Sequence, residues 1–260
     1  MSDILQIERN GAVATLWLNR PDVHNAFDEH LIAAIAATLR AVDADAGVRV
    51  VVLGGRGKSF CAGGDLQWMR RIAGFGREEN LADAGALAEM LRTLATLSKP
   101  TIARVHGAAL AGATGLVSAC DIAIAVPEAK FGTTEVRLGL IPATISPYVI
   151  RAIGARAAQR YFLTGERFDA FEAHRLGLVH EVVPADGLDA RIDSIIEALL
   201  AGAPAALADC KRLIEDMRDK PIDADLIADT TRRIADARGS IDAREGIAAF
   251  FARRAPGWGN

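Results

Sequence analysis

The sequence predicts an α/β fold in which a core of interleaved strands and helices is followed by a helical C-terminal extension. From Ile4 to about Val126, short apolar runs typical of buried strands alternate with stretches of helical periodicity. After about Asp186 only helical patterns remain, separated by proline and glycine. Strands and helices interleaved first, with helices alone afterwards, are typical of an α/β core with an appended helical region. We therefore place the two parts at residues 1–186 and 187–260.

Each expected element follows from its local pattern. Residues 12–18 read as a strand, and Asp28 can cap the helical run that follows it. The remaining strands of the first part are expected at residues 49–53, 101–105 and 122–125, and its remaining helices at 81–97 and 113–119. The C-terminal helices are expected at residues 188–200, 205–217, 222–237 and 243–252.

Composition excludes several classes of protein. The 260 residues are 51% hydrophobic and 24% charged, and the net charge of −3 does not favour a nucleic-acid partner. The longest uncharged apolar stretch, residues 107–120, is shorter than the ~20 residues of a membrane span, so no membrane partner is expected. Cys61, Cys120 and Cys210 lack the spacing of a disulfide framework or a zinc site. With no signal peptide at the N-terminus, we expect a cytoplasmic protein without a metal.

Two glycine turns, residues 59–65 and 106–112, each follow a predicted strand. The second precedes an apolar helix, whose N-terminus offers unpaired N–H groups and a positive dipole end. Two converging N–H groups can form an oxyanion hole. From spacing alone, tight turns without a catalytic role remain the alternative. A phosphate-binding loop ending at Ser59 is excluded because the required glycine is replaced by Val52.

The chain resembles the enoyl-CoA hydratase/isomerase (crotonase) superfamily in motifs that follow the family order. The segment Phe60-Cys-Ala-Gly-Gly-Asp-Leu66 looks like the family's F-x-A-G-A-D-L turn. The other matches are Asn19-Arg-Pro21 with Asn25-Ala26, Lys99-Pro-Thr-Ile-Ala103, Ala119-Cys-Asp-Ile122, Phe131-Gly with Glu135, Gly139-Leu-Ile-Pro142, Ala173-His-Arg-Leu-Gly-Leu-Val179, and Glu245-Gly with Phe250 and Arg254. The resemblance implies a crotonase-like ββα spiral core with a C-terminal helical trimerisation region, assembled as a homotrimer or a hexamer.

The resemblance also implies a site for an acyl-CoA thioester, in which coenzyme A enters as part of the substrate and no separate cofactor is needed. The oxyanion hole falls on the N–H groups of Gly64 and Gly112, and Glu135 becomes the general acid/base. The residues implied in substrate and CoA binding are Ala62, Gly64, Asp65, Leu66, Gln67, Gly112 and Arg253. In the family, the basic residue at the position of Arg253 often comes from a neighbouring subunit. The residues implied in the acyl pocket are Trp68, Met69 and Ile145.

One departure from the family pattern bears on the reaction. Hydratases of the family usually carry a second glutamate three residues after the oxyanion-hole glycine, where this chain has Gly115. Residues 137–150 and the run from Asp65 to Met69 resemble the bacterial branch that hydrates branched, carboxylated enoyl-CoAs. That branch includes methylglutaconyl-CoA hydratases of leucine degradation and carboxygeranoyl-CoA hydratases. We therefore expect an enoyl-CoA hydratase, a lyase, with a substrate such as 3-methylglutaconyl-CoA.

Two alternatives stay open at this point. One is a Δ3-Δ2-enoyl-CoA isomerase on the same scaffold, because a single carboxylate can shuttle a proton between two carbons. The other is an inactive CoA-thioester-binding protein. If the pocket has room for a side chain at position 115, Gly115→Glu is expected to shift the preference of the enzyme towards crotonyl-CoA.

Overall fold

A six-stranded sheet forms the centre of the protein in the computed structural model, which describes residues 4–258. The strand order is β1-β2-β3-β4-β6-β9; β1 is antiparallel to β2, and all the other neighbours are parallel. The strands are β1 (Leu5–Asn10), β2 (Val13–Leu18), β3 (Val50–Gly55), β4 (Thr101–Val105), β6 (Ile122–Ala125) and β9 (Glu181–Val182). Every residue of the central strand β3 is buried, as expected for a parallel strand that is covered on both faces.

A smaller three-stranded sheet, in the order β5-β7-β8, is formed by strands that lie between β4 and β9 in the chain, on either side of β6. Its strands are β5 (Ala108–Leu110), β7 (Lys130–Gly132) and β8 (Phe168–Asp169). The helices of the core are α1 (Glu29–Ala44), α2 (Leu66–Ile72), α3 (Arg77–Ala95), α4 (Gly112–Ala119), α5 (Ser146–Thr164) and α6 (Ala170–Leu176), with short 3-10 turns at Pro21–Val23, Glu135–Leu138 and Ala185–Gly187. The α1 helix begins at the predicted cap, where the Asp28 side chain accepts a hydrogen bond from the N–H of Leu31.

The predicted α/β class is confirmed by this arrangement. The strands expected at residues 101–105 and 122–125 and the helix expected at 188–200 occupy those bounds, and the other predicted elements differ by a few residues at their ends. The sequence analysis missed the strands β1, β5, β7, β8 and β9 and the helices α2, α5 and α6. The strand β5 lies within residues 106–112, which were expected to form a turn. Within the described part of the chain, none of the helices combines the length and the apolar character that a membrane span requires.

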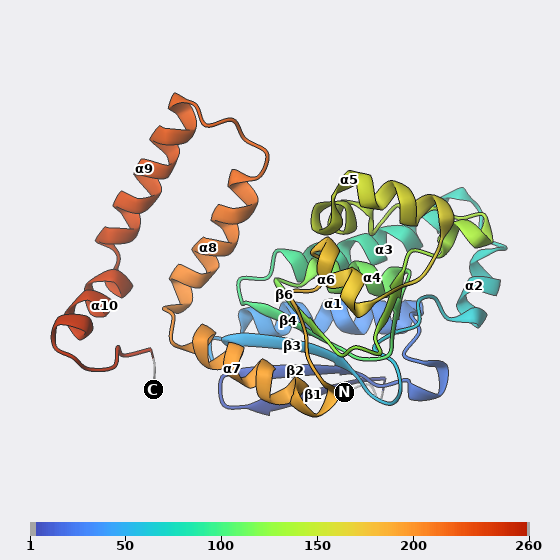
Figure 1. The fold of residues 1–260 in the computed structure, drawn as a ribbon, viewed down its shortest axis with the longest axis horizontal. Coiled ribbons are helices and arrows are strands. Elements are labelled where there is room, and N and C mark those ends of the chain that lie inside the picture. Colours follow the sequence, from blue (N-terminus) through green and yellow to red (C-terminus); the bar gives the residue numbers. More distant parts are fainter. Residues whose placement is uncertain (1–3, 259–260) are drawn as a thin grey trace.

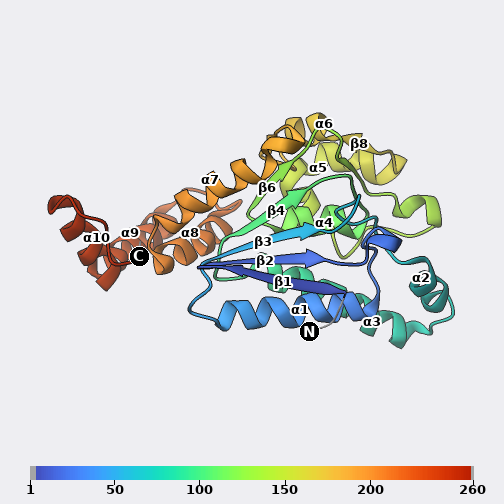
Figure 2. The same ribbon diagram turned by 90° about the horizontal axis from the view of Figure 1, so that it is seen from below.

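The C-terminal helices divide into one that packs on the core and three that extend from it. Buried side chains of α7 (Leu188–Leu200) lie against the large sheet, whereas α8 (Pro204–Met217), α9 (Ala224–Gly239) and α10 (Ile241–Phe251) project as an arm (Figures 1 and 2). We call residues 204–258 the C-terminal arm. The predicted division at residues 186 and 187 therefore separates α7 from a sheet with which it packs.

Arg49 fixes the base of the C-terminal arm. Its guanidinium donates to the carbonyl oxygens of Leu200 at 2.9 Å and Gly202 at 2.5 Å, where the arm begins, and to that of Trp258 at 2.5 Å, where it ends. The indole N–H of Trp258 also donates to the carbonyl oxygen of Ala201 at 3.1 Å. The two ends of the arm therefore meet beside β3.

Candidate active site

The first predicted oxyanion donor, Gly64, lies in a loop that is paired with the segment before α1. The N–H of Phe27 donates to the carbonyl oxygen of Gly63 at 2.7 Å, and the N–H of Asp65 donates to that of Phe27 at 2.7 Å. This parallel bridge uses the carbonyl oxygen of Gly63 and the N–H of Asp65, the two neighbours of Gly64. The N–H of Gly64 itself has no acceptor among residues 4–258, so it is available to a substrate oxygen.

The second predicted donor, Gly112, is the first residue of α4. Its N–H has no partner within the helix, as expected for an N-terminal position, and none elsewhere in the described residues. Ala111 precedes it with φ +52° and ψ −122°, a conformation that L-residues rarely adopt. The N–H of Ala111 is bound to the carbonyl oxygen of Gly132 at 2.7 Å, so strand β7 holds this turn in place.

Glu135 follows β7 and begins a 3-10 turn. The carbonyl oxygen of Gly132 accepts hydrogen bonds from the N–H of Ala111 at 2.7 Å and the hydroxyl of Thr114 at 3.1 Å, at the start of α4. Glu135 follows Gly132 by three residues, so its backbone lies at most about 11 Å from Gly132. Burial raises the pKa of the Glu135 carboxyl above its ordinary value, and a backbone hydrogen bond opposes that shift only in part. The Oε2 atom is buried and makes no hydrogen bond within residues 4–258. A buried carboxylate oxygen without a hydrogen bond is costly, and ionisable groups with shifted pKa values are concentrated at functional sites.

The position of the missing second glutamate is filled by another side chain. An ideal Cβ at Gly115 would lie 2.3 Å from Cγ2 and 2.6 Å from Cβ of Ile145, which is 1% exposed. The condition attached to Gly115→Glu, room for a side chain at position 115, is therefore not met in the chain as it stands, because Ile145 occupies that volume. Glu135 is left as the one carboxylate at a predicted catalytic position.

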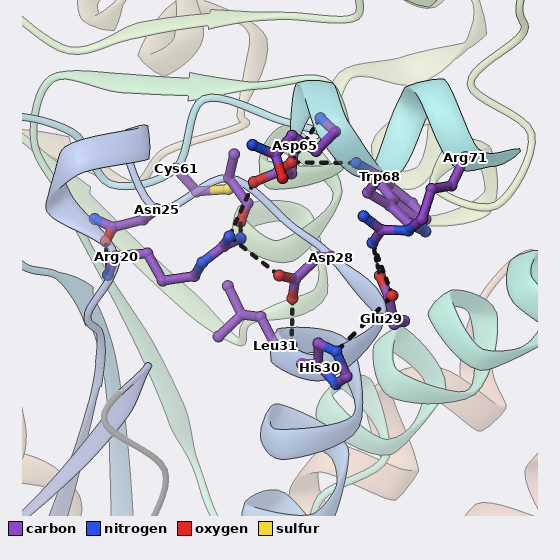
Figure 3. A network of polar contacts seen from close by, with 12 residues as sticks. Arg20, Asn25, Asp28, Glu29, His30, Leu31, Cys61, Asp65, Trp68 and Arg71 are labelled. Carbon is purple, nitrogen blue, oxygen red and sulfur yellow. Dashed lines mark hydrogen bonds and ion pairs between the residues drawn. The ribbon is translucent and has the colours of Figure 1, made fainter. Parts of the chain in front are cut away.

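A polar network joins the loop that carries Gly64 to the segment before α1 (Figure 3). The Asp65 carboxylate accepts hydrogen bonds from the N–H groups of Gln67 and Trp68 and so caps α2, and it pairs with Arg20 at 2.9 Å. Burial pushes the pKa of Asp65 upward, but the hydrogen bonds from Trp68, Gln67 and Arg20 outweigh it, and the pKa lies below its ordinary value. Asp65 was predicted to bind substrate; its side chain is committed to this network, and only 8% of the residue is exposed.

The other predicted site residues fall into two groups. Trp68 and Met69 lie against Gly64, since a Cβ there would approach Trp68 Cζ3 and Met69 Sδ at 3.3 Å each. Leu66 is 73% exposed, Gln67 is exposed and Ala62 is partly buried, all on the same loop and helix start. Arg253 is exposed at the end of α10, in the arm that stands apart from the core of the single chain (Figure 1).

Two residues that sequence reasoning did not assign to this site belong to its framework. The ring of Phe27 lies against Gly112, where an added Cβ would approach its Cε2 at 3.1 Å. Arg20 binds both partners of the bridge, through the carbonyl oxygen of Ala26 before Phe27 and the carboxylate of Asp65 after Gly64. The only sequence signal for them was the match at Asn19-Arg-Pro21 and Asn25-Ala26, which did not reveal a contact with either glycine turn.

The geometry thus offers two free backbone donors, one buried carboxylate and an apolar lining. Such a set can stabilise negative charge on a carbonyl oxygen while a proton moves nearby.

Comparisons with known proteins agree on one family. A family model described as enoyl-CoA hydratase/isomerase matches residues 8–260. The crystal structure of an enoyl-CoA hydratase from Shewanella pealeana ATCC 700345 is similar with a TM-score of 0.95 and 45% identity, covering 98% of this chain and 96% of that one. The crotonyl-CoA hydratase of Syntrophomonas wolfei is 31% identical over 255 residues, 95% of each chain. The 2,3-dehydroadipyl-CoA hydratase of Escherichia coli (strain K12) is 30% identical over 259 residues, 98% of each chain.

Proposed function

Because the chain belongs to the enoyl-CoA hydratase/isomerase family, we propose that it is an enoyl-CoA hydratase that adds water to a 2-enoyl-CoA thioester. The observation that carries this proposal is the buried, unpaired Oε2 of Glu135 close in the fold to two glycines with free N–H groups. The relatives named as hydratases support the reaction class.

In this mechanism the thioester carbonyl oxygen accepts hydrogen bonds from the N–H groups of Gly64 and Gly112. Addition of water at the β-carbon builds negative charge on that oxygen as an enolate-like state forms. The two donors are fixed by the backbone before the substrate arrives, so they need no rearrangement as charge develops. Loss of one such donor typically costs ~2.7–4 kcal/mol of transition-state stabilisation.

Glu135 acts as the general base and then the general acid. Its ionised carboxylate takes a proton from the attacking water, and the proton is returned to the α-carbon. The raised pKa suits this double use, because a pKa closer to the working pH eases both steps. With Ile145 in the place of a second carboxylate, a single side chain must both hold the water and move the proton.

We further propose that the preferred substrate is a carboxylated, branched enoyl-CoA such as 3-methylglutaconyl-CoA. A carboxylate on the substrate supplies a second acceptor for the water, which Gly115 does not provide. The name of the Escherichia coli relative, a hydratase of 2,3-dehydroadipyl-CoA, supports a carboxylated acyl group within the family.

A Δ3-Δ2-enoyl-CoA isomerase is the second candidate, favoured by the single carboxylate beside an apolar wall. A panel of crotonyl-CoA, 3-methylglutaconyl-CoA and a 3-enoyl-CoA, assayed with purified protein, separates the possibilities. The proposal expects hydration, with the highest kcat/KM for 3-methylglutaconyl-CoA. A higher kcat/KM for crotonyl-CoA overturns the substrate proposal, and turnover of the 3-enoyl-CoA alone overturns the hydratase.

A further inference from the structure

We propose that Phe27 is a positioning residue that sets the spacing between the two oxyanion donors, and that Arg20 clamps it in place. This inference rests on the proposed function, because it assigns a role in the oxyanion hole. It concerns residues other than the two donor glycines and Glu135.

The first support is that Phe27 contacts both glycine turns. Its backbone N–H and carbonyl oxygen pair with Gly63 and Asp65, the two neighbours of Gly64, at 2.7 Å each. Its ring lies against Gly112, with Cε2 and Cδ2 at 3.1 and 3.3 Å from the place of an added Cβ. Phe27 is only 2% exposed, so its ring is held by packing on all sides. One residue therefore spans the interval between the two donors.

The second support is the way in which Arg20 holds this residue. One guanidinium nitrogen of Arg20 donates to the carbonyl oxygen of Ala26 at 2.5 Å, directly before Phe27. The other contacts Asp65 at 2.9 Å and Asp28 at 3.1 Å, on the far side of the bridge and directly after Phe27 (Figure 3). The planar fork of an arginine can hold several acceptors in fixed directions, which a lysine ammonium cannot.

The third support is a second brace on the same segment. Asn25 is fully buried with φ +56°, and its Oδ1 accepts a hydrogen bond from the N–H of Arg20 at 2.7 Å. Its amide nitrogen donates to the carbonyl oxygens of Ser59 and Arg56 at 2.8 and 2.9 Å. Residues 20–28 are thus fixed to the loop that carries Gly64 at several points, and the Phe27 ring connects them to Gly112. Replacing Phe27 by a smaller side chain should therefore let the N–H groups of Gly64 and Gly112 shift relative to each other.

The test compares Phe27→Leu and Arg20→Lys with two matched controls. Phe168→Leu removes another buried aromatic ring. Arg104→Lys alters an arginine whose side chain is 17% exposed, as is that of Arg20, and which also pairs with a carboxylate, that of Asp189. For each variant kcat and KM are measured with the best enoyl-CoA substrate, and Kd is measured for free CoA. The infrared carbonyl stretch of bound butanoyl-CoA, which has no double bond to hydrate, reports hydrogen bonding to the thioester oxygen without turnover.

In the wild type, two hydrogen bonds should lower the carbonyl frequency of bound butanoyl-CoA. In Phe27→Leu we expect it to move back towards that of the free thioester, with kcat reduced about 10- to 100-fold, because a misplacement of about 1 Å at the reacting centre can cost that much. KM and the Kd of free CoA should change little. Arg20→Lys should cause a smaller shift of the carbonyl frequency and a smaller loss of kcat than Phe27→Leu. Both effects should be larger in Arg20→Ala than in Arg20→Lys.

Each outcome distinguishes the inference from the proposed function. A wild-type carbonyl frequency equal to that of the free thioester overturns the oxyanion site and this inference together. A lowered frequency in the wild type that is retained in both Phe27→Leu and Arg20→Lys overturns this inference alone. The inference alone is also overturned if kcat falls as far in the controls Phe168→Leu and Arg104→Lys as it does in Phe27→Leu and Arg20→Lys. If Phe27→Leu does not fold, the Arg20 series decides.

Discussion

The packing of Ile145 against Gly115 predicts that an alanine at position 115 is tolerated only when position 145 is glycine. In Gly115→Ala the new Cβ would lie 2.3 Å from Ile145 Cγ2 and 2.6 Å from Ile145 Cβ, where ordinary contacts are 3.4–4 Å. Rotation of the isoleucine can move Cγ2 but not Cβ, so either α4 or the start of α5 has to shift.

The magnitude follows from two opposing terms. Overpacking a core typically costs ~1–3 kcal/mol. Replacing glycine by alanine within a helix such as α4 returns about 1 kcal/mol. Because the contact is far inside the ordinary distance, the upper part of the range applies, and we expect a net loss of about 2 kcal/mol in the free energy of unfolding.

The cost of Gly115→Ala should depend on which atoms remain at position 145. Ile145→Ala removes Cγ2 but leaves Cβ at 2.6 Å, so Gly115→Ala should remain costly in that variant. Ile145→Gly leaves only Cα, at 3.6 Å, which is an ordinary contact. In the Ile145→Gly background, Gly115→Ala should therefore be neutral or stabilising, because it also fills part of the cavity.

Urea unfolding of Gly115→Ala in the wild-type, Ile145→Ala and Ile145→Gly backgrounds measures this coupling. Gly85→Ala is the matched control, since Gly85 lies within α3 with nothing within 4 Å of its added Cβ, and should gain about 1 kcal/mol. An equal cost of Gly115→Ala in all three backgrounds would refute the reasoning. If the coupling holds, Gly115→Glu needs Ile145→Gly beside it before a second carboxylate can enter the site.

Four further predictions concern catalysis, pH, backbone strain and assembly. Glu135→Gln should lower kcat by ~10²–10⁴ with little change in the Kd of free CoA, and retention of a third of the activity, far outside that range, would contradict its role. The acid limb of kcat/KM should lie above pH 4.5, because burial raises the pKa of Glu135 above that value and only the ionised form accepts a proton; a limb at or below 4.5 argues against it. Ala111→Gly should stabilise the protein by about 1 kcal/mol in urea unfolding, since relief of ~1–3 kcal/mol of strain exceeds the ~0.4–1 kcal/mol of added unfolded-state entropy, whereas a net loss would show that the turn is unstrained. Sedimentation should give a trimer or a hexamer, because the C-terminal arm exposes Ile227, Ile247 and Phe250, and a monomer of 27.5 kDa at micromolar concentration would contradict this.

Much of the fold was predictable because its central elements carry strong local patterns. The strand at residues 101–105 and the helix at 188–200 are apolar or amphipathic throughout, and both occur with those bounds. The edge strand β1 was missed because most of its residues are polar and exposed, so it lacks a buried run. The α5 helix was missed because Gly154, with φ +76°, interrupts its periodicity in the middle.

The site was predictable only as far as its residues lie in short motifs. Gly64, Gly112 and Glu135 came from the resemblance to a family. Within residues 4–258, no hydrogen bond is made by the N–H groups of the two glycines or by the Oε2 atom of Glu135. The contacts that define their surroundings join residues far apart in the chain, such as Phe27 with Gly112 and Gly115 with Ile145. No local pattern encodes such pairs, because each side chain is typical of a buried position on its own.

The Arg49 clamp gives the C-terminal arm an unusual connectivity. The arm leaves the core at Gly202 and returns to the same guanidinium at Trp258, so its helices form a closed loop whose two ends are tied at one point. Exchange of such an arm between two copies would require both ends to open together, which disfavours domain swapping. We therefore expect the arm to stay attached to Arg49 of its own chain. Trp258 also donates a hydrogen bond to the carbonyl oxygen of Ala201, shortly before α8. Removal of Trp258 would therefore loosen the arm where it joins the core, and not at its far end.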